Sequence, residues 1–182
     1  MGLFGNKTKS LAKEISKEVF EFSIITVHRL NDLSQSSEND EDIYKKWEVA
    51  DNDDIQMKLA HEFQIFLLYS LSWQSSNILT ESKHKTFMDN VVKYTINKTP
   101  NINNNLVAKR YSEYTQYKLF PIDENLEFAP DETDNSALGR FSYHLSNILE
   151  DTVNPIIDGT YLFSLVNQFI EARNIQSRFS KL

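Results

Sequence analysis

The sequence predicts an all-α fold, a single irregular bundle of about six helices. From Asn6 to Thr99 the chain contains no glycine and no proline, the residues that most often form tight turns or end helices. A β-sandwich or a doubly wound sheet of this length would need more of both in its turns. The chain has 182 residues, of which 40% are hydrophobic and 12% aromatic. It is therefore expected to form one domain with a substantial core over residues 1–182.

The first helix is predicted by apolar residues that recur every three or four positions from Leu11 to Leu33. Ser10 is placed to cap its first turn, so residues 1–9 are expected to form a frayed polar terminus. The segment 34–40 is rich in Ser, Asn and acidic residues and is predicted to be a linker. A short helix around Trp47 is expected after it.

A second, central helix is predicted over residues 55–79. The acidic run Asp51–Asp54 precedes it, where carboxylates accept hydrogen bonds from free backbone N–H groups and oppose the helix dipole. The middle of this helix is apolar nearly all round, which is typical of an element covered on every side. A further helix is expected over 80–95, although the β-branched residues within Val91–Ile96 also fit a strand.

The tyrosine-rich segment follows a clear break at Pro100. One of the asparagines among residues 101–105 is expected to cap the next helix, which extends to about Lys118. Residues 121–135 lack periodicity and hold six acidic residues, two prolines and no basic residue. They are predicted to form a long acidic surface loop, and loops of that length are often functional.

Two helices are predicted near the C-terminus. The first covers residues 137–149, where apolar positions again recur every three or four residues. The second begins at Asn154–Pro155, which is a capping residue followed by proline at the first helical position. Gly159 leaves the start of this last helix open, and the helix is expected to end near Phe179.

Composition excludes several classes of site. The chain has no cysteine, which rules out disulfides, thiolate zinc sites, iron–sulfur clusters and cysteine nucleophiles. The N-terminus lacks the continuous apolar segment of a secretory signal, and the most apolar run, residues 63–73, is too short to span a bilayer. We therefore expect a soluble protein of a reducing compartment, the cytoplasm, with no membrane association.

A di-metal carboxylate centre is the enzymatic alternative for an all-α chain. Such a centre needs a glutamate from each of two helices and a Glu-x-x-His turn from each of two others. The chain contains one such turn, formed by Glu81 and His84, and Glu62 occupies a position expected to face inward. Because the second turn is missing, a metal- or ligand-dependent enzyme that uses these three residues is kept only as an alternative, and no cofactor is predicted.

Four histidines lie on four different predicted helices, and the sequence leaves open whether they converge in space. They are His28, His61, His84 and His144. None has a second histidine four residues away, as a zincin helix requires. A Gly-x-Ser-x-Gly elbow and a glycine-rich phosphate loop are also missing. No catalytic residue is therefore predicted.

Charge is unevenly distributed in this chain, whose net charge is −7. The segments Glu38–Asp54 and Pro121–Asn135 are acidic, whereas Lys83–Lys118 carries seven Lys or Arg against two acidic residues. Tyrosines interleaved with basic residues can bind nucleic acid, which makes residues 83–118 a second alternative. The acidic net charge opposes that interpretation and favours recognition of another protein through complementary charge.

We therefore expect a non-enzymatic helical module that binds another protein, of the adaptor, regulator or neutraliser type. Tyr and Arg often carry much of the binding energy of an interface. The residues expected to face the partner are Lys109, Arg110, Tyr114, Tyr117 and Lys118. The acidic segment Asp123–Asp134 is a second candidate surface, and a homo-oligomer is compatible with the sequence. Whether the stripe Tyr111, Tyr114 and Tyr117 is core or exposed stays open.

Overall fold

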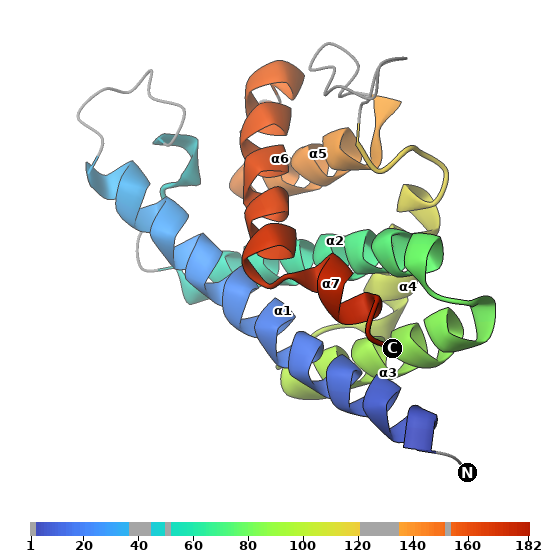
Figure 1. Ribbon diagram of the computed structural model, residues 1–182. Coiled ribbons are helices and arrows are strands. Elements are labelled where there is room, and N and C mark those ends of the chain that lie inside the picture. Colours follow the sequence, from blue (N-terminus) through green and yellow to red (C-terminus); the bar gives the residue numbers. More distant parts are fainter. Residues whose placement is uncertain (1–2, 37–44, 50–51, 121–134, 152–153) are drawn as a thin grey trace.

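The computed structural model describes residues 3–36, 45–49, 52–120, 135–151 and 154–182 (Figure 1). Over these ranges the fold is all-α, with seven α-helices, one short 3₁₀ helix at Lys45–Trp47 and no strand. The helices are α1 Leu3–Ser36, α2 Asp53–Ile78, α3 Glu81–Lys98, α4 Asn104–Tyr114, α5 Ala137–Leu149, α6 Pro155–Ala172 and α7 Ile175–Phe179. The prediction of an all-α bundle of about six helices is confirmed.

Helix α2 runs through the centre of the molecule, and α1, α3, α4, α5 and α7 all pack against it (Figure 1). Every residue from Leu59 to Ser72 is buried. Phe66 stacks on Phe141 of α5 with ring centroids 4.4 Å apart, and Phe63 meets the same ring edge-on at 5.0 Å. This arrangement explains why the sequence of α2 is apolar nearly all round.

Helix α1 packs mainly on α3 and also on α2 (Figure 1). Its buried stripe contains many small side chains, which allow the helix axes to approach closely. These small buried residues are Thr8, Ala12, Ser16, Ser23, Thr26 and Ser34. A buried hydrogen-bond chain crosses the interface, because Gln64 donates to Ser23 Oγ at 3.1 Å and accepts from Thr99 Oγ1 at 2.7 Å.

The start of α1 corrects one prediction. Residues 3–9 are helical, so the expected frayed terminus over residues 1–9 and the cap at Ser10 are wrong for that range. The physical reason is that the buried stripe extends one turn further toward the N-terminus. Thr8 is buried, and Ala12 follows it four residues later on the same face.

The C-terminal helix is broken, where one continuous helix had been expected. Helix α6 ends at Ala172, and Asn174 adopts a left-handed conformation with φ of 50° before α7 begins. Asparagine tolerates this conformation better than most residues. The turn directs Phe179 into the core, where its ring lies edge-on to Phe87 of α3 at 4.9 Å. A straight helix would have carried Phe179 away from this contact.

Two further expectations concern short segments. The β-branched run Val91–Ile96 lies within α3, so the strand alternative is wrong. The acidic segment 121–134 falls outside the described residues, and the loop predicted there stays a prediction. The residues on either side of segment 121–134 lie side by side, because Ala137 N donates to the carbonyl of Lys118 at 2.8 Å.

No helix over the described residues has an apolar stretch long enough to cross a membrane.

We predict that Phe66→Ala lowers the free energy of unfolding by about 3–5 kcal/mol, because the truncation leaves a cavity between α2 and α5. Urea denaturation monitored by circular dichroism measures the change. The matched control is Ile78→Ala at the partly exposed end of α2, which should change stability by about 0.5 kcal/mol or less. Equal losses for the two variants would contradict the central role of the Phe66 contact.

Candidate functional site

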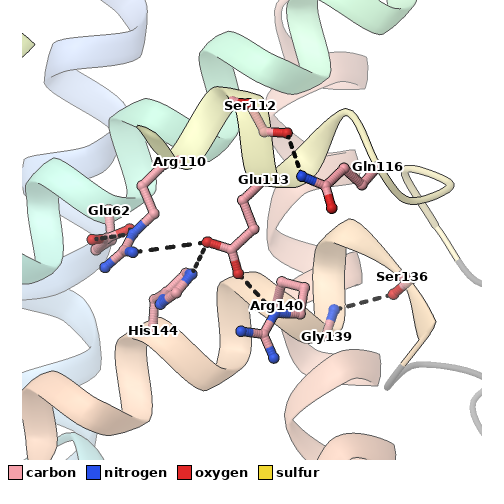
Figure 2. A network of polar contacts seen from close by, with 9 residues as sticks. All are labelled: Glu62, Arg110, Ser112, Glu113, Gln116, Ser136, Gly139, Arg140 and His144. Atoms are coloured by element: carbon pink, nitrogen blue, oxygen red, sulfur yellow. Dashed lines mark hydrogen bonds and ion pairs between the residues drawn. The ribbon is translucent and has the colours of Figure 1, made fainter. Parts of the chain in front are cut away.

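Helix α4 carries most of the residues that the sequence selected for partner binding. Asn103 caps it by accepting a hydrogen bond from Asn105 N at 2.8 Å, which confirms the predicted asparagine cap. The helix lies against α2 on one side and near α5 on another (Figure 2). Its rotation about its own axis decides which of its polar and aromatic residues reach solvent.

Lys109 and Lys118 are exposed, as a partner-facing role requires. Tyr114 has no exposed surface, and its ring packs against Phe66 at 5.4 Å, so the expectation that it faces a partner is wrong. Arg110 is largely buried and points inward to Glu62. Two of the five selected residues therefore serve the interior, because a helix that buries a tyrosine also buries the residue one turn before it.

The tyrosine stripe lies at the edge of the core. Tyr111 is partly buried, its ring lies edge-on to Tyr69 at 5.6 Å, and its hydroxyl donates to Ser72 Oγ. Tyr117 is also partly buried, and its carbonyl accepts a hydrogen bond from Tyr69 Oη at 3.3 Å. With Tyr114 fully buried, the stripe mainly attaches α4 to α2.

A charged network joins α2, α4 and α5 (Figure 2). Arg110 Nε donates to both carboxylate oxygens of Glu62, at 3.1 and 3.2 Å. Glu113 accepts from Arg140 Nε at 2.8 Å and from His144 Nε2 at 2.9 Å, and it lies 3.8 Å from Arg110 Nη1. Two carboxylates and two guanidinium groups balance, so the network is neutral when His144 is neutral.

Burial sets the protonation of the histidine. Burial, helped by the nearby positive charge of Arg110 and opposed by Glu113, lowers the pKa of His144 to about 4. At neutral pH the ring is therefore uncharged. Its Nε2 must carry the hydrogen, because the Glu113 carboxylate can only accept.

The two glutamates respond differently to the same environment. Burial raises the pKa of Glu62, although the charge and hydrogen bonds of Arg110 oppose the shift. Burial also acts to raise the pKa of Glu113, but hydrogen bonds from Arg140 and His144 dominate together, so its pKa is lowered. Glu113 is thus a carboxylate held between α4 and α5, which suits it to fixing the position of Arg140.

The alternative metal site is wrong for the described residues. Glu62 is engaged by Arg110, Glu81 is exposed, and His84 Nδ1 lies 2.8 Å from Ser75 Oγ near the far end of α2. About 20 Å of helix separates Glu62 from Ser75. No group of three or more His, Asp or Glu within the described ranges is arranged to hold a metal ion.

The four histidines do not converge. His28 is exposed on α1, and His61 Nε2 lies 3.1 Å from the carbonyl of Pro100. His84 and His144 have the separate partners Ser75 and Glu113 given above. The question that the sequence left open is therefore answered by four unrelated local environments.

The outer edge of the network forms a surface that the sequence did not identify. The guanidinium carbon of Arg140 lies 4.7 Å from the ring centroid of Tyr143, a cation–π contact, and 43% of Tyr143 is exposed. Arg140 is only partly buried, and its Nε edge is held by the carboxylate of Glu113. One available signal was the spacing of Arg140, Tyr143 and His144, which places all three on the side of α5 facing away from Leu138 and Leu145.

Comparison with known proteins gives no functional information, because no protein-family model, curated protein or solved structure matches this chain.

We predict that the folded state loses stability as pH falls from 7 to 5, because His144 stays neutral in the folded protein while the unfolded chain takes up a proton below about pH 6.5. A folded pKa of about 4 corresponds to a loss of roughly 2 kcal/mol over this interval. His144→Gln keeps a donor for Glu113 and should remove most of that loss. Urea titrations at each pH measure it.

The control for this prediction is His28→Gln, which changes an exposed histidine on α1. It should retain the pH dependence of the unmodified chain. His61, whose pKa is also lowered by burial, adds to the loss, and Glu62, whose pKa is raised by burial, opposes it; both variants retain these two contributions, so the difference between them reports His144. If His144→Gln and the unmodified chain lose stability equally, the buried neutral state of His144 is contradicted.

Proposed function

We propose that this chain is a non-enzymatic helical module that binds another protein through the α4–α5 surface. This surface is defined as Lys109, Tyr117, Lys118, Arg140 and Tyr143. The observation that carries the proposal is the arrangement of Arg140, which is fixed by Glu113 at 2.8 Å and stacked over the exposed ring of Tyr143. Tyr and Arg are the residue types that most often dominate binding energy.

Preorganisation supports this choice of surface. An arginine side chain free in solvent loses much conformational entropy when a partner immobilises it. Arg140 is already held at its edge by a carboxylate, through Nε, and on one face by an aromatic ring. The side chain of Arg140 is therefore already ordered before a partner contacts it. The smaller loss of conformational entropy on binding favours affinity.

Charge indicates the chemistry of the partner. Lys109 and Lys118 are exposed, and Lys109 lies one helical turn before Glu113. The negative charge of Glu113 is compensated by its own contacts with Arg140 and His144. A protein surface that presents carboxylates beside an apolar contact for Tyr143 fits this arrangement. The cysteine-free composition fits a reducing, cytoplasmic setting for the complex.

Nucleic-acid binding through residues 83–118 has less support. Arg110 and Tyr114 are directed inward. Lys83 Nζ donates a hydrogen bond to the main-chain oxygen of Leu182 at 2.6 Å. The stretch therefore offers fewer cations and stacking rings than its composition indicates. The second protein-binding surface predicted at Asp123–Asp134 lies outside the described residues and stays a prediction.

The proposal is tested first by site-specific photo-cross-linking. A benzophenone amino acid placed at Tyr143, in cells that express the chain, should give a discrete adduct with one protein. The same group at Ile78, a partly exposed site at the end of α2, should not. Adducts that are identical from both positions, or formed with nucleic acid, would contradict the proposal.

With the cross-linked protein purified, we predict that Tyr143→Ala weakens binding by at least about 30-fold, which corresponds to loss of a residue central to the interface. Lys118→Glu should weaken binding mainly through slower association, with an effect that shrinks as salt is raised. Calorimetry and stopped-flow kinetics measure the two effects. Trp73→Ala, which removes a comparably exposed aromatic residue from α2, is the control and should bind normally.

A further inference from the structure

A second surface lies along the outer side of α1. Ile25 is the most exposed large hydrophobic side chain in the described part of the chain, with 61% of its surface exposed. Charged residues continue its face of the helix, because positions three or four apart lie one above the other. Together they form the α1 stripe, defined as Lys17, Glu21, Ile25, Arg29 and Asp32.

The apolar area around Ile25 extends beyond its own side chain. On another side of the same stretch of α1, which Ile25 itself does not line, α1 and α2 leave a shallow groove of about 270 Å³. Its apolar lining comes from Ile24 and Val27 of α1 and Met57 and Ala60 of α2, and His28, Asp53 and Gln56 form its polar edge. A partner that covers Ile25 and reaches around α1 therefore also has apolar surface to cover, and an unbranched methionine side chain adapts readily to such a contact.

When two copies of the α1 stripe face each other, opposite charges meet in the antiparallel orientation and like charges meet in the parallel one. In an antiparallel pairing of two α1 helices centred on Ile25, Glu21 lies four residues before the centre and meets Arg29 of the other copy, four residues after it. Lys17 and Asp32, eight before and seven after, meet in the same way. In a parallel pairing Glu21 would meet Glu21 and Arg29 would meet Arg29, and like charges repel.

These charges are available for such a contact. Arg29 and Asp32 are exposed and make no ion pair with any described residue. Lys17 and Glu21 form one exposed pair at 3.5 Å within the helix, an interaction of little energy in water. All four charged groups can therefore take new partners at small cost.

We propose that the α1 stripe is the interface of an antiparallel homodimer. This inference does not depend on whether a partner binds at the α4–α5 surface. The two copies of Ile25 pack near the two-fold axis, and the charged pairs set direction and register. Helix α1 is 34 residues and about 50 Å long, so it provides enough length for an interface of ordinary size.

Sedimentation velocity over a concentration series tests the dimer. We expect the unmodified chain to dimerise and Ile25→Asp to raise the dimer dissociation constant at least about 100-fold, since both copies lose the apolar contact and gain a charge. Ile78→Asp should leave it unchanged. A chain that is monomeric at about 100 μM overturns the proposal, as does a dimer that tolerates Ile25→Asp.

A charge exchange tests the antiparallel register and depends less on Ile25. Arg29→Glu should weaken the dimer about 10-fold at low salt, because Glu21 then faces a like charge. The double variant Glu21→Arg/Arg29→Glu should restore the dissociation constant to within about threefold. If the double variant binds no more tightly than Arg29→Glu alone, the antiparallel register is wrong.

Cross-linking locates the axis directly, because the natural chain has no cysteine. Ile25→Cys should be joined to its copy by a short bismaleimide reagent, which gives a covalent dimer on a denaturing gel. Ile78→Cys provides the matched control and should stay monomeric on the gel. Equal cross-linking of the two variants would show random collision and overturn the proposed axis.

Discussion

Phe66 stacks on Phe141, and the rest of the molecule is arranged around the helix that carries this contact. Because α2 is apolar on nearly every side, it can lower its free energy only if other helices cover all of its faces. Helices α1 and α3 cover one part of it, α4 and α5 another, and α7 a third. The irregular shape of the bundle follows from this requirement, since short helices must be placed wherever the long ones leave α2 uncovered.

Helix α4 shows how a buried charge influences a surface. Glu62 has only 3% of its surface exposed, and removing a carboxylate from water is unfavourable unless a cation compensates it. Arg110 provides that cation, and its position determines which side of α4 faces α2. Tyr114, one turn later, is then buried, whereas Lys109 is directed to solvent. One ion pair in the interior thus helps to select the side chains that α4 exposes to solvent.

The two surfaces described above belong to different parts of the bundle and are built in different ways. The α4–α5 surface owes its order to Glu113, which holds Arg140 from the interior side. The α1 stripe needs no such support, because a long helix presents its residues at a regular spacing whether or not another element touches them. The spacing of residues along one helix is therefore readable from sequence, whereas which side of a helix stays exposed, and any surface assembled from two helices, depends on how the helices pack.

The sequence by itself determined the helices and several of their ends. A repeat of three and four residues is a local property, so it located α2, α3 and α5 closely, and Asn103 and Ser136 cap helices through hydrogen bonds within a few residues. Only the tertiary structure decided that α6 and α7 are separate and that Tyr114 is buried. It also decided that Glu113, Arg140 and His144 meet across two helices. These outcomes depend on contacts between residues far apart in the chain, which local periodicity cannot encode.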